Sequence, residues 1–274
     1  MSEIEQVADV AENGLPRGTT KAFSIENDQA LAALVNLIAV LADNEYFYGL
    51  RISGWAMSAP MLEAGVACAA VAQEKLGHCR ALYPLLEELP WPNPPAPLQR
   101  EQDRERRYCV SFLDEPFPTW SHVVATLALI GPALNTLAAP LANSSYTALA
   151  RRVRRILEEE KQLTIWYSES LVRDLVAAPQ GREMLQQRVD ELWVEMLCWF
   201  GPPNEAGVEA LKRENLLSMS NEEMRQSYLD KVVPLLQEVG IRLPVERNEV
   251  TQKWKYGELP WSRWNPLQRR LEGQ

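Results

Sequence analysis

Two glutamates, one lysine and one histidine fall at positions where a helical reading of the sequence surrounds them with apolar residues. In the stretch 61–89, Lys75 lies at the centre of an apolar stripe if successive residues turn by about 100°, and His78 lies about 60° from it. On the same geometry Glu45 and Glu160 each lie in the apolar stripe of another segment. Charged side chains are rarely buried without a partner. We therefore expect these four side chains, called the charge cluster below, to meet in the core.

Two kinds of chemistry are open to the charge cluster. Glutamate and histidine bind metals, and buried carboxylates on long helices are typical of ferritin-like di-iron bundles, which take a Glu from two helices and a Glu-x-x-His from the other two. An ammonium cannot bind a metal, but it can pair with the same carboxylates. Two glutamates with Lys75 leave a charge of −1, which a protonated His78 neutralises. This balance favours an internal ion-pair cluster, so no metal and no cofactor are expected.

Composition excludes several classes of function. The 274 residues carry a net charge of −9, which argues against a nucleic-acid partner. Only two histidines are present, His78 and His122, so any site built on several histidines is excluded. The four cysteines form no Cys-x-x-Cys pair, and Cys68 and Cys79, which lie on the apolar stripe, are expected as core thiols. No signal peptide or bilayer-spanning apolar run is expected, and we place the chain in the cytoplasm, away from membranes.

Hydrophobic periodicity predicts an all-α protein without strands. The expected helices are Asp28 to Ser53, about 61–89, 120–142 with a kink at Pro132, 146–177, 181–200 and 221–239, the last opened by a capping box of Ser220 and Glu223 and closed by Gly240. We predict a flexible N-terminal arm (1–27), a ferritin-like four-helix bundle with additional C-terminal helices (28–240) and an extended tail (241–274). The tail carries Trp254, Tyr256, Trp261 and Trp264, which should pack on the bundle or on a partner.

Several stretches resemble the phenylacetic acid catabolic family, the phenylacetyl-CoA epoxidase subunits PaaA and PaaC. NEYFYGL, APMLEAGVACAAVAQEKLGH and RRILEEEKQL match the spacing of the family's two metal-bearing helix pairs. CWFGPPNE, SNEEMRQSYLDKVVPLLQEVGIRLP and KYGELPW look more like PaaA than PaaC. The resemblance covers about 30–265 and implies a ferritin-like fold, a di-iron site in catalytic members, and an oligomer with a homologous PaaA-like or PaaC-like subunit.

Carried over position by position, the resemblance implies six metal-ligand positions, of which half keep a ligand. Glu45, His78 and Glu160 match the family's ligands, whereas Lys75 and Leu163 stand where it has a glutamate and a histidine, and its third-helix carboxylate falls on or beside Gly131. If a metal binds, its ligands would be Glu45, His78 and Glu160, with the neighbouring Glu74 or Glu159 as an additional candidate. Iron is the metal that the resemblance implies in that case.

Two functions remain open from the sequence. The first is a metal-degenerate, non-catalytic subunit of a multicomponent oxygenase for an aromatic acyl-CoA such as phenylacetyl-CoA, with a structural or regulatory role. The alternative is an active acyl-CoA mono-oxygenase or epoxidase with an atypical iron site, so whether the chain is an enzyme stays undecided. A third, weaker reading is a stand-alone protein whose former active-site cavity binds a small ligand.

Overall fold

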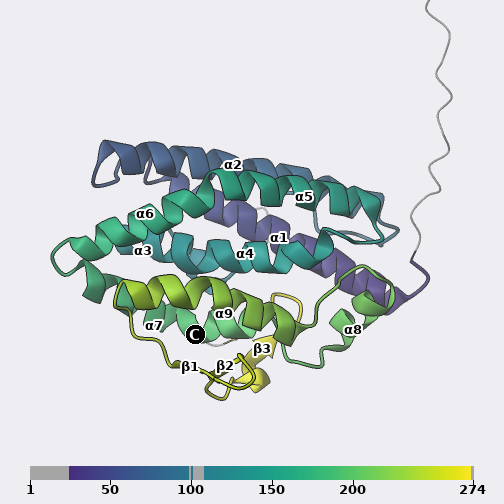
Figure 1. The fold of residues 1–274 in the computed structure, drawn as a ribbon. Helices are drawn as coiled ribbons and strands as arrows, with labels where there is room; N and C mark the ends of the chain where they lie inside the picture. Colours follow the sequence, from purple (N-terminus) through teal and green to yellow (C-terminus); the bar gives the residue numbers. More distant parts are fainter. Residues whose placement is uncertain (1–24, 99, 101–107, 273–274) are drawn as a thin grey trace, which may run out of the picture.

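The structure, a computed structural model, describes residues 25–98, 100 and 108–272 and is mostly helical. Four long helical segments form the bundle: α1 (Asp28–Ser53), α2 (Leu62–Glu88), the α3–α4 segment (α3 Trp120–Ala125, π-helical η3 Thr126–Ile130, α4 Gly131–Ala138) and the α5–α6 segment (α5 Thr147–Gln162, α6 Thr164–Ala177). In Figure 1, α2 and α5 run side by side above α1 and α4. The expected all-α class and its ferritin-like bundle are confirmed.

Further helices form a second layer beneath the α3–α4 segment. These are α7 (Gly181–Trp199), α8 (Ala206–Arg213) and α9 (Asn221–Glu238), with short 3₁₀ turns at Ser111–Leu113, Ala139–Leu141 and Trp261–Arg263. α7 contacts α3, α9 contacts α4, and α8 contacts α1 near the end of the bundle where α1 begins (Figure 1). The sequence did not predict α8, because eight residues carry too little periodicity to separate a helix from a loop.

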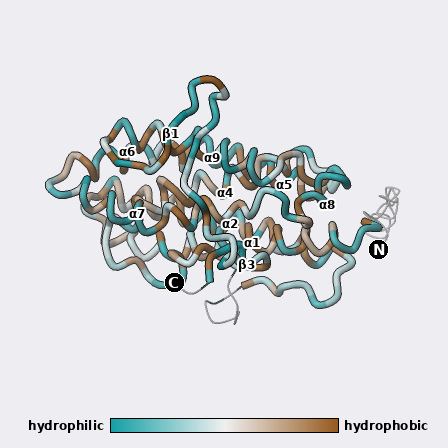
Figure 2. The backbone as a smooth tube through the Cα atoms, turned by 90° about the horizontal axis from the view of Figure 1, so that it is seen from below, coloured by the Kyte–Doolittle hydropathy of each residue, from teal (hydrophilic) through white to brown (hydrophobic). Residues whose placement is uncertain are grey.

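Local sequence explains where the helices start and stop. The side chain of Asn27 accepts hydrogen bonds from the amides of Gln29 and Ala30 at the start of α1. The predicted capping box of Ser220 and Glu223 opens α9, and Gly240, with φ of +80°, follows its last turn. In Figure 2 hydrophobic and hydrophilic stretches alternate along the helices, as expected when each helix turns one face to the core.

Two predicted helices are interrupted. The helix expected over 146–177 breaks at Leu163, which has φ of −127° and ψ of −65° and separates α5 from α6. β-Branched residues follow directly, at Thr164 and Ile165, and weaken the helix there. The kink expected at Pro132 is a π-helical segment just before it, in which the amide of Gly131 donates to the carbonyl of Thr126. Since Pro132 has no amide N–H, the carbonyl of Ala128, four residues earlier, lacks its α-helical donor.

The C-terminal tail contains short strands, which corrects the prediction that the chain has none. β1 (Val245–Arg247) pairs with β2 (Trp254–Tyr256), and β3 (Trp264–Asn265) pairs with β4 (Arg270–Leu271), both antiparallel. Pairs of two or three residues leave no readable period in the sequence. The tail contacts its own chain: Trp254 donates to Asp230 (2.9 Å), and Tyr256 donates to Glu222 (2.6 Å), both on α9.

The predicted domain limits remain predictions. Most of the expected arm (1–24) and the charged stretch 101–107 lie outside the described residues. The expectation that no apolar run could span a bilayer is wrong by length and composition: Asp28–Ser53 and Trp120–Leu141 both qualify. Their most apolar windows are 78% and 83% buried in the bundle, however, as is usual for helices that form a protein core.

Candidate functional site

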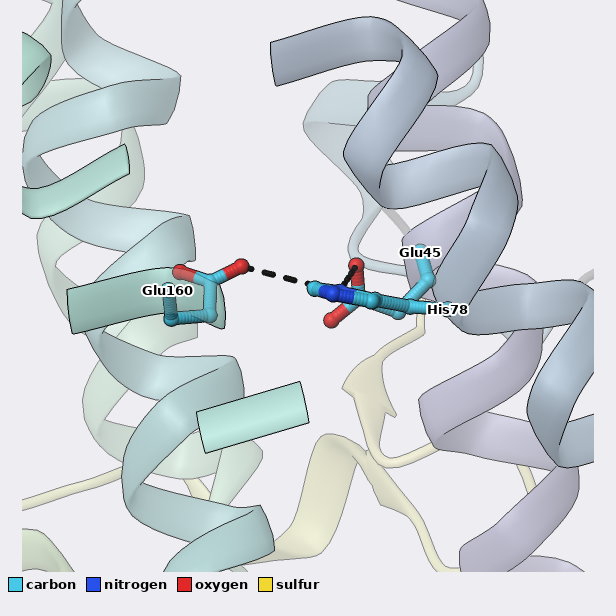
Figure 3. Close-up of side chains that lie close together, drawn as sticks. All are labelled: Glu45, His78 and Glu160. Carbon is cyan, nitrogen blue, oxygen red and sulfur yellow. Dashed lines mark ion pairs between the residues drawn. The ribbon is translucent and has the colours of Figure 1, made fainter. Parts of the chain in front are cut away.

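The structure brings the four members of the charge cluster together from α1, α2 and α5. The Lys75 ammonium, fully buried, forms an ion pair with Glu160 and lies 3.4 Å from Oε2 of Glu45. His78 Nδ1 lies 3.4 Å from Glu45 Oε2 and 3.7 Å from Glu160 Oε1. Figure 3, which does not draw the lysine, shows the imidazole between the two carboxylates. Each carboxylate therefore faces both cationic side chains.

The electrostatics of the cluster favour the charged forms of Glu45, Lys75 and His78. Burial alone would raise the pKa of Glu45, but the charge of Lys75, followed by the contact with His78, lowers it. Burial alone would lower the pKa of Lys75, yet the charges of Glu160 and Glu45 raise it above its usual value. Burial also opposes protonation of His78, and its contact with Glu45 raises the pKa nonetheless. Two carboxylates are thus balanced by an ammonium and, when His78 is protonated, by an imidazolium.

Side chains that sequence reasoning did not single out complete the surroundings. The ring of Tyr48 lies 4.8 Å from the Lys75 ammonium in a cation–π contact, and Asn135 donates to Glu160 Oε2 at 2.9 Å. Tyr48 follows Glu45 by three residues, so helical spacing could have placed both on one face. Asn135 lies on a helix with no charged member of the cluster, and nothing in the sequence linked it to Glu160.

The two additional candidate metal ligands, Glu159 and Glu74, make different contacts. Glu159 reaches the cluster, with Oε2 at 3.1 Å from His78 Nε2, and its other oxygen accepts from Arg155. Glu74 instead accepts a hydrogen bond from Thr164 (2.8 Å), and burial and the nearby charge of Glu160 raise its pKa. Glu159 therefore contacts the outer side of the imidazole, whereas Glu74 lies near the cluster but forms its hydrogen bond with Thr164.

A single ion would find ligand atoms at this site, but the Lys75 ammonium competes for them. Glu45, His78 and Glu160 each offer an atom within 4.8 Å of the others, a spacing that could hold a metal. The ammonium pairs with both carboxylates within that same group. A cation placed there would be repelled by Lys75 and would have to displace it.

A di-iron centre does not fit the residues present. Such a centre needs four carboxylates and two histidines, and the family resemblance implies that Lys75, Gly131 and Leu163 stand at three of these positions. A Cβ added to Gly131 would lie 3.2 Å from the hydroxyl of Tyr48, so the tyrosine already fills the space in front of that position. Leu163 lies at the break between α5 and α6, outside regular helix.

The cysteines lie in the core, and the second histidine makes packing contacts. Cys68 and Cys79 are free and buried, as predicted, and Cys109 and Cys198 are free and buried as well. The second histidine, His122, stacks on Phe112 at 5.2 Å between ring centres and contacts Arg188 at 2.9 Å through Nε2. Burial, followed by the charge of that arginine, lowers the pKa of His122 to about 4. His122 is therefore a neutral packing residue at pH 7. Its contacts are with Phe112 and Arg188, which are not members of the charge cluster.

Comparison with known proteins identifies the family. The family model described as "Phenylacetic acid catabolic protein" matches residues 18–274. The chain is 25% identical over 246 residues to the PaaA component of the 1,2-phenylacetyl-CoA epoxidase of Escherichia coli (strain K12), a match that covers 85% of this chain and 77% of that protein. The resemblance found in the motifs is confirmed, including the likeness to PaaA. The chain belongs to the phenylacetic acid catabolic protein family.

Proposed function

We propose that this chain is a metal-degenerate, non-catalytic subunit of a multicomponent oxygenase that acts on an aromatic acyl-CoA such as phenylacetyl-CoA. It would support a homologous catalytic subunit in a cytoplasmic hetero-oligomer. The family membership and the similarity to PaaA of an epoxidase support the type of complex and of substrate. One observation carries the non-catalytic part: the Lys75 ammonium is paired with both buried carboxylates.

The physical argument is that Lys75 replaces the cation that the carboxylates would otherwise bind. Glu45 and Glu160 are almost fully buried, and burying two unpaired carboxylates would be strongly unfavourable. A lysine supplies the compensating charge from within the chain, with Tyr48 packed against it. The bundle is then stable without a metal, and the cluster holds α1, α2 and α5 together.

Exposed apolar side chains favour an assembly. Met57, in the turn before α2, is 96% exposed, and Leu62 and Val66 on the first turns of α2 are 80% and 55% exposed. The last two are four residues apart and share one helix face. Adjacent exposed apolar groups of this kind commonly mark contact surfaces between proteins. A subunit that supports a partner needs such a surface, whereas the aromatic tail is already packed on its own chain.

The second candidate function is the active acyl-CoA mono-oxygenase or epoxidase with an atypical iron site. The spacing of the ligand atoms of Glu45, His78 and Glu160 supports it. The two functions predict different effects when these residues are replaced. An iron enzyme loses its activity when the carboxylates are removed, whereas a supporting subunit needs only the fold.

A reconstitution experiment separates the two functions. The chain is mixed with a family subunit that carries both Glu-x-x-His motifs, and complex formation and acyl-CoA oxidation are measured. The variant Glu45→Met/Lys75→Met/Glu160→Met removes two possible ligands and the cation together. Our proposal expects this variant to assemble and to support activity as wild type does. Loss of activity with assembly intact, or oxidation by the wild-type chain alone, would favour the iron enzyme.

A further inference from the structure

Two buried arginines hold the C-terminal end of α7, one from α9 and one from the tail. The last carbonyl groups of a helix have no donor within the helix, so other groups must satisfy them. Each guanidinium donates to two of these oxygens: Arg225 to Leu197 (2.8 Å) and Gly201, and Arg269 to Trp199 (3.0 Å) and Phe200. The two arginines are 0% and 3% exposed, so water has no access to take their place.

The guanidinium of Arg269 lies in a site that is built around it. It pairs with Glu205 at 3.1 Å, and Trp264 stacks on it at 5.5 Å from the ring centre. A Cβ added to Gly201 would lie 3.0 Å from Nη2 of Arg269 and 2.6 Å from Oε2 of Glu205, so this turn needs a glycine. The connection from α7 to α8 is therefore shaped to receive the arginine of the tail.

The next residue of the tail, Arg270, holds a different part of the chain. Its Nη1 lies 2.9 Å from Oδ2 of Asp114 and donates to the carbonyl of Cys109 at 3.4 Å. Both partners belong to residues 108–114, called the crossing segment here. Two adjacent side chains of the tail thus reach two separate segments.

The crossing segment joins the bundle to the second layer. On one side, Asn44 of α1 accepts a hydrogen bond from the amide of Val110 at 3.0 Å. On the other side, Glu195 of α7 accepts from the amide of Ser111 at 2.8 Å. The backbone of this segment therefore depends on side chains of α1 and α7, and Arg270 adds the tail to the same junction.

These contacts make the tail a link between the two layers. The strands of the tail lie beneath α9 in Figure 1, and its carbonyl at Pro266 accepts a hydrogen bond from Asn36 of α1 (3.1 Å). We propose that the tail is a conformational clasp. With Arg269 and Arg270 in place, the end of α7, α8 and the crossing segment are closed on the bundle, and their release opens these parts while the bundle stays folded. The clasp goes beyond the supporting function proposed above and does not depend on it.

Local opening is expected because the bundle has its own core. The charge cluster is formed by α1, α2 and α5, and the contacts of its members described above do not involve the tail. Proteins open in cooperative units whose stabilities differ. A loss confined to the clasp should therefore appear in the segments that it holds.

The test is native-state hydrogen exchange of the full-length chain, followed by mass spectrometry. Arg269→Met should make the amides of 197–213 exchange at least about tenfold faster, and Arg270→Met should do the same for 108–114, because hydrogen bonds to a charged group contribute that much. The central turns of α1 and α2 should keep their wild-type rates in both variants. Arg242→Met, which changes an exposed arginine at the start of the tail, is the matched control and should change no segment.

Two results would overturn the clasp. Wild-type exchange of 197–213 in Arg269→Met would show that the arginine does not hold the end of α7, and equal acceleration in every helix would show a loss of overall stability instead of a local opening. If Arg269→Met loses its helical circular dichroism, Arg269→Lys decides: it keeps the charge but lacks the planar fork that spans two carbonyls. The same local acceleration is expected there, and wild-type rates would overturn the proposal equally. No metal and no partner subunit is used, so the result is separate from that of the reconstitution.

Discussion

Replacing Lys75 by methionine tests whether the ammonium is the cation that the core requires. The side chain is fully buried, and its carboxylate partners Glu45 and Glu160 are 3% and 1% exposed, so water cannot take over its role. Breaking a buried ion pair by removing one partner typically costs about 3–5 kcal/mol. For a chain of this size, 1 kcal/mol corresponds to about 2–4 °C in the melting temperature, so Lys75→Met should melt about 6–20 °C lower.

The measurement is urea denaturation followed by circular dichroism, with a thermal melt as a second readout. Lys161→Met is the matched control, since its ammonium is exposed and pairs only loosely with Glu158 at 4.0 Å; it should change stability by less than about 0.5 kcal/mol. The variant with methionine at positions 45, 75 and 160 should be far more stable than Lys75→Met, because no buried charge is then left without a partner. If Lys75→Met costs no more than the control, or if the triple variant is the less stable of the two, the ion-pair reasoning is wrong.

Three further predictions address the cluster and its surroundings. Lys75→Glu should be destabilised without metal, since it gathers three buried carboxylates, and Mn²⁺ should raise its melting temperature but not that of wild type; equal shifts in both would refute this. His122 has a folded pKa of about 4, below the unfolded value, so its contribution to stability is present above about pH 6.5 and is lost as pH falls towards 4; urea denaturation at pH 7.5 and 5 should show a smaller loss for His122→Gln than for wild type. Burial raises the pKa of Cys68 and Cys79 to about 12, so a thiol reagent at pH 8 should modify them only after unfolding, and rapid reaction of the folded chain would contradict their burial.

The fold was largely predictable because helical periodicity extends over many residues. α1 begins and ends where the sequence indicated, and the capping box of Ser220 and Glu223 is formed. The break at Leu163 was not predictable, since the apolar stripe continues through it and the β-branched Thr164 and Ile165 lower helix propensity only slightly. In the tail, β2 contacts α9 and β4 contacts α7, and no local sequence pattern indicates these contacts.

The charge cluster was predictable for a similar reason. A lysine in the middle of an apolar stripe needs a carboxylate, and two other stripes each contained one. Asn135 was missed because it reaches Glu160 from a helix whose own pattern is apolar. The contacts of Arg269 and Arg270 were also missed, since their partners lie far away in the sequence and hydrophobic periodicity does not connect them.

The central claim, that Lys75 stands in place of a metal, is tested most directly by the iron content of the wild-type chain. The protein is purified from iron-supplemented cells, then reconstituted with Fe²⁺ without oxygen, desalted and analysed for iron per chain. The pairing of the ammonium with Glu45 and Glu160 predicts well under one iron per chain in both samples. Two irons per chain, retained after desalting, would show that Lys75 does not occupy the metal position and would contradict the account.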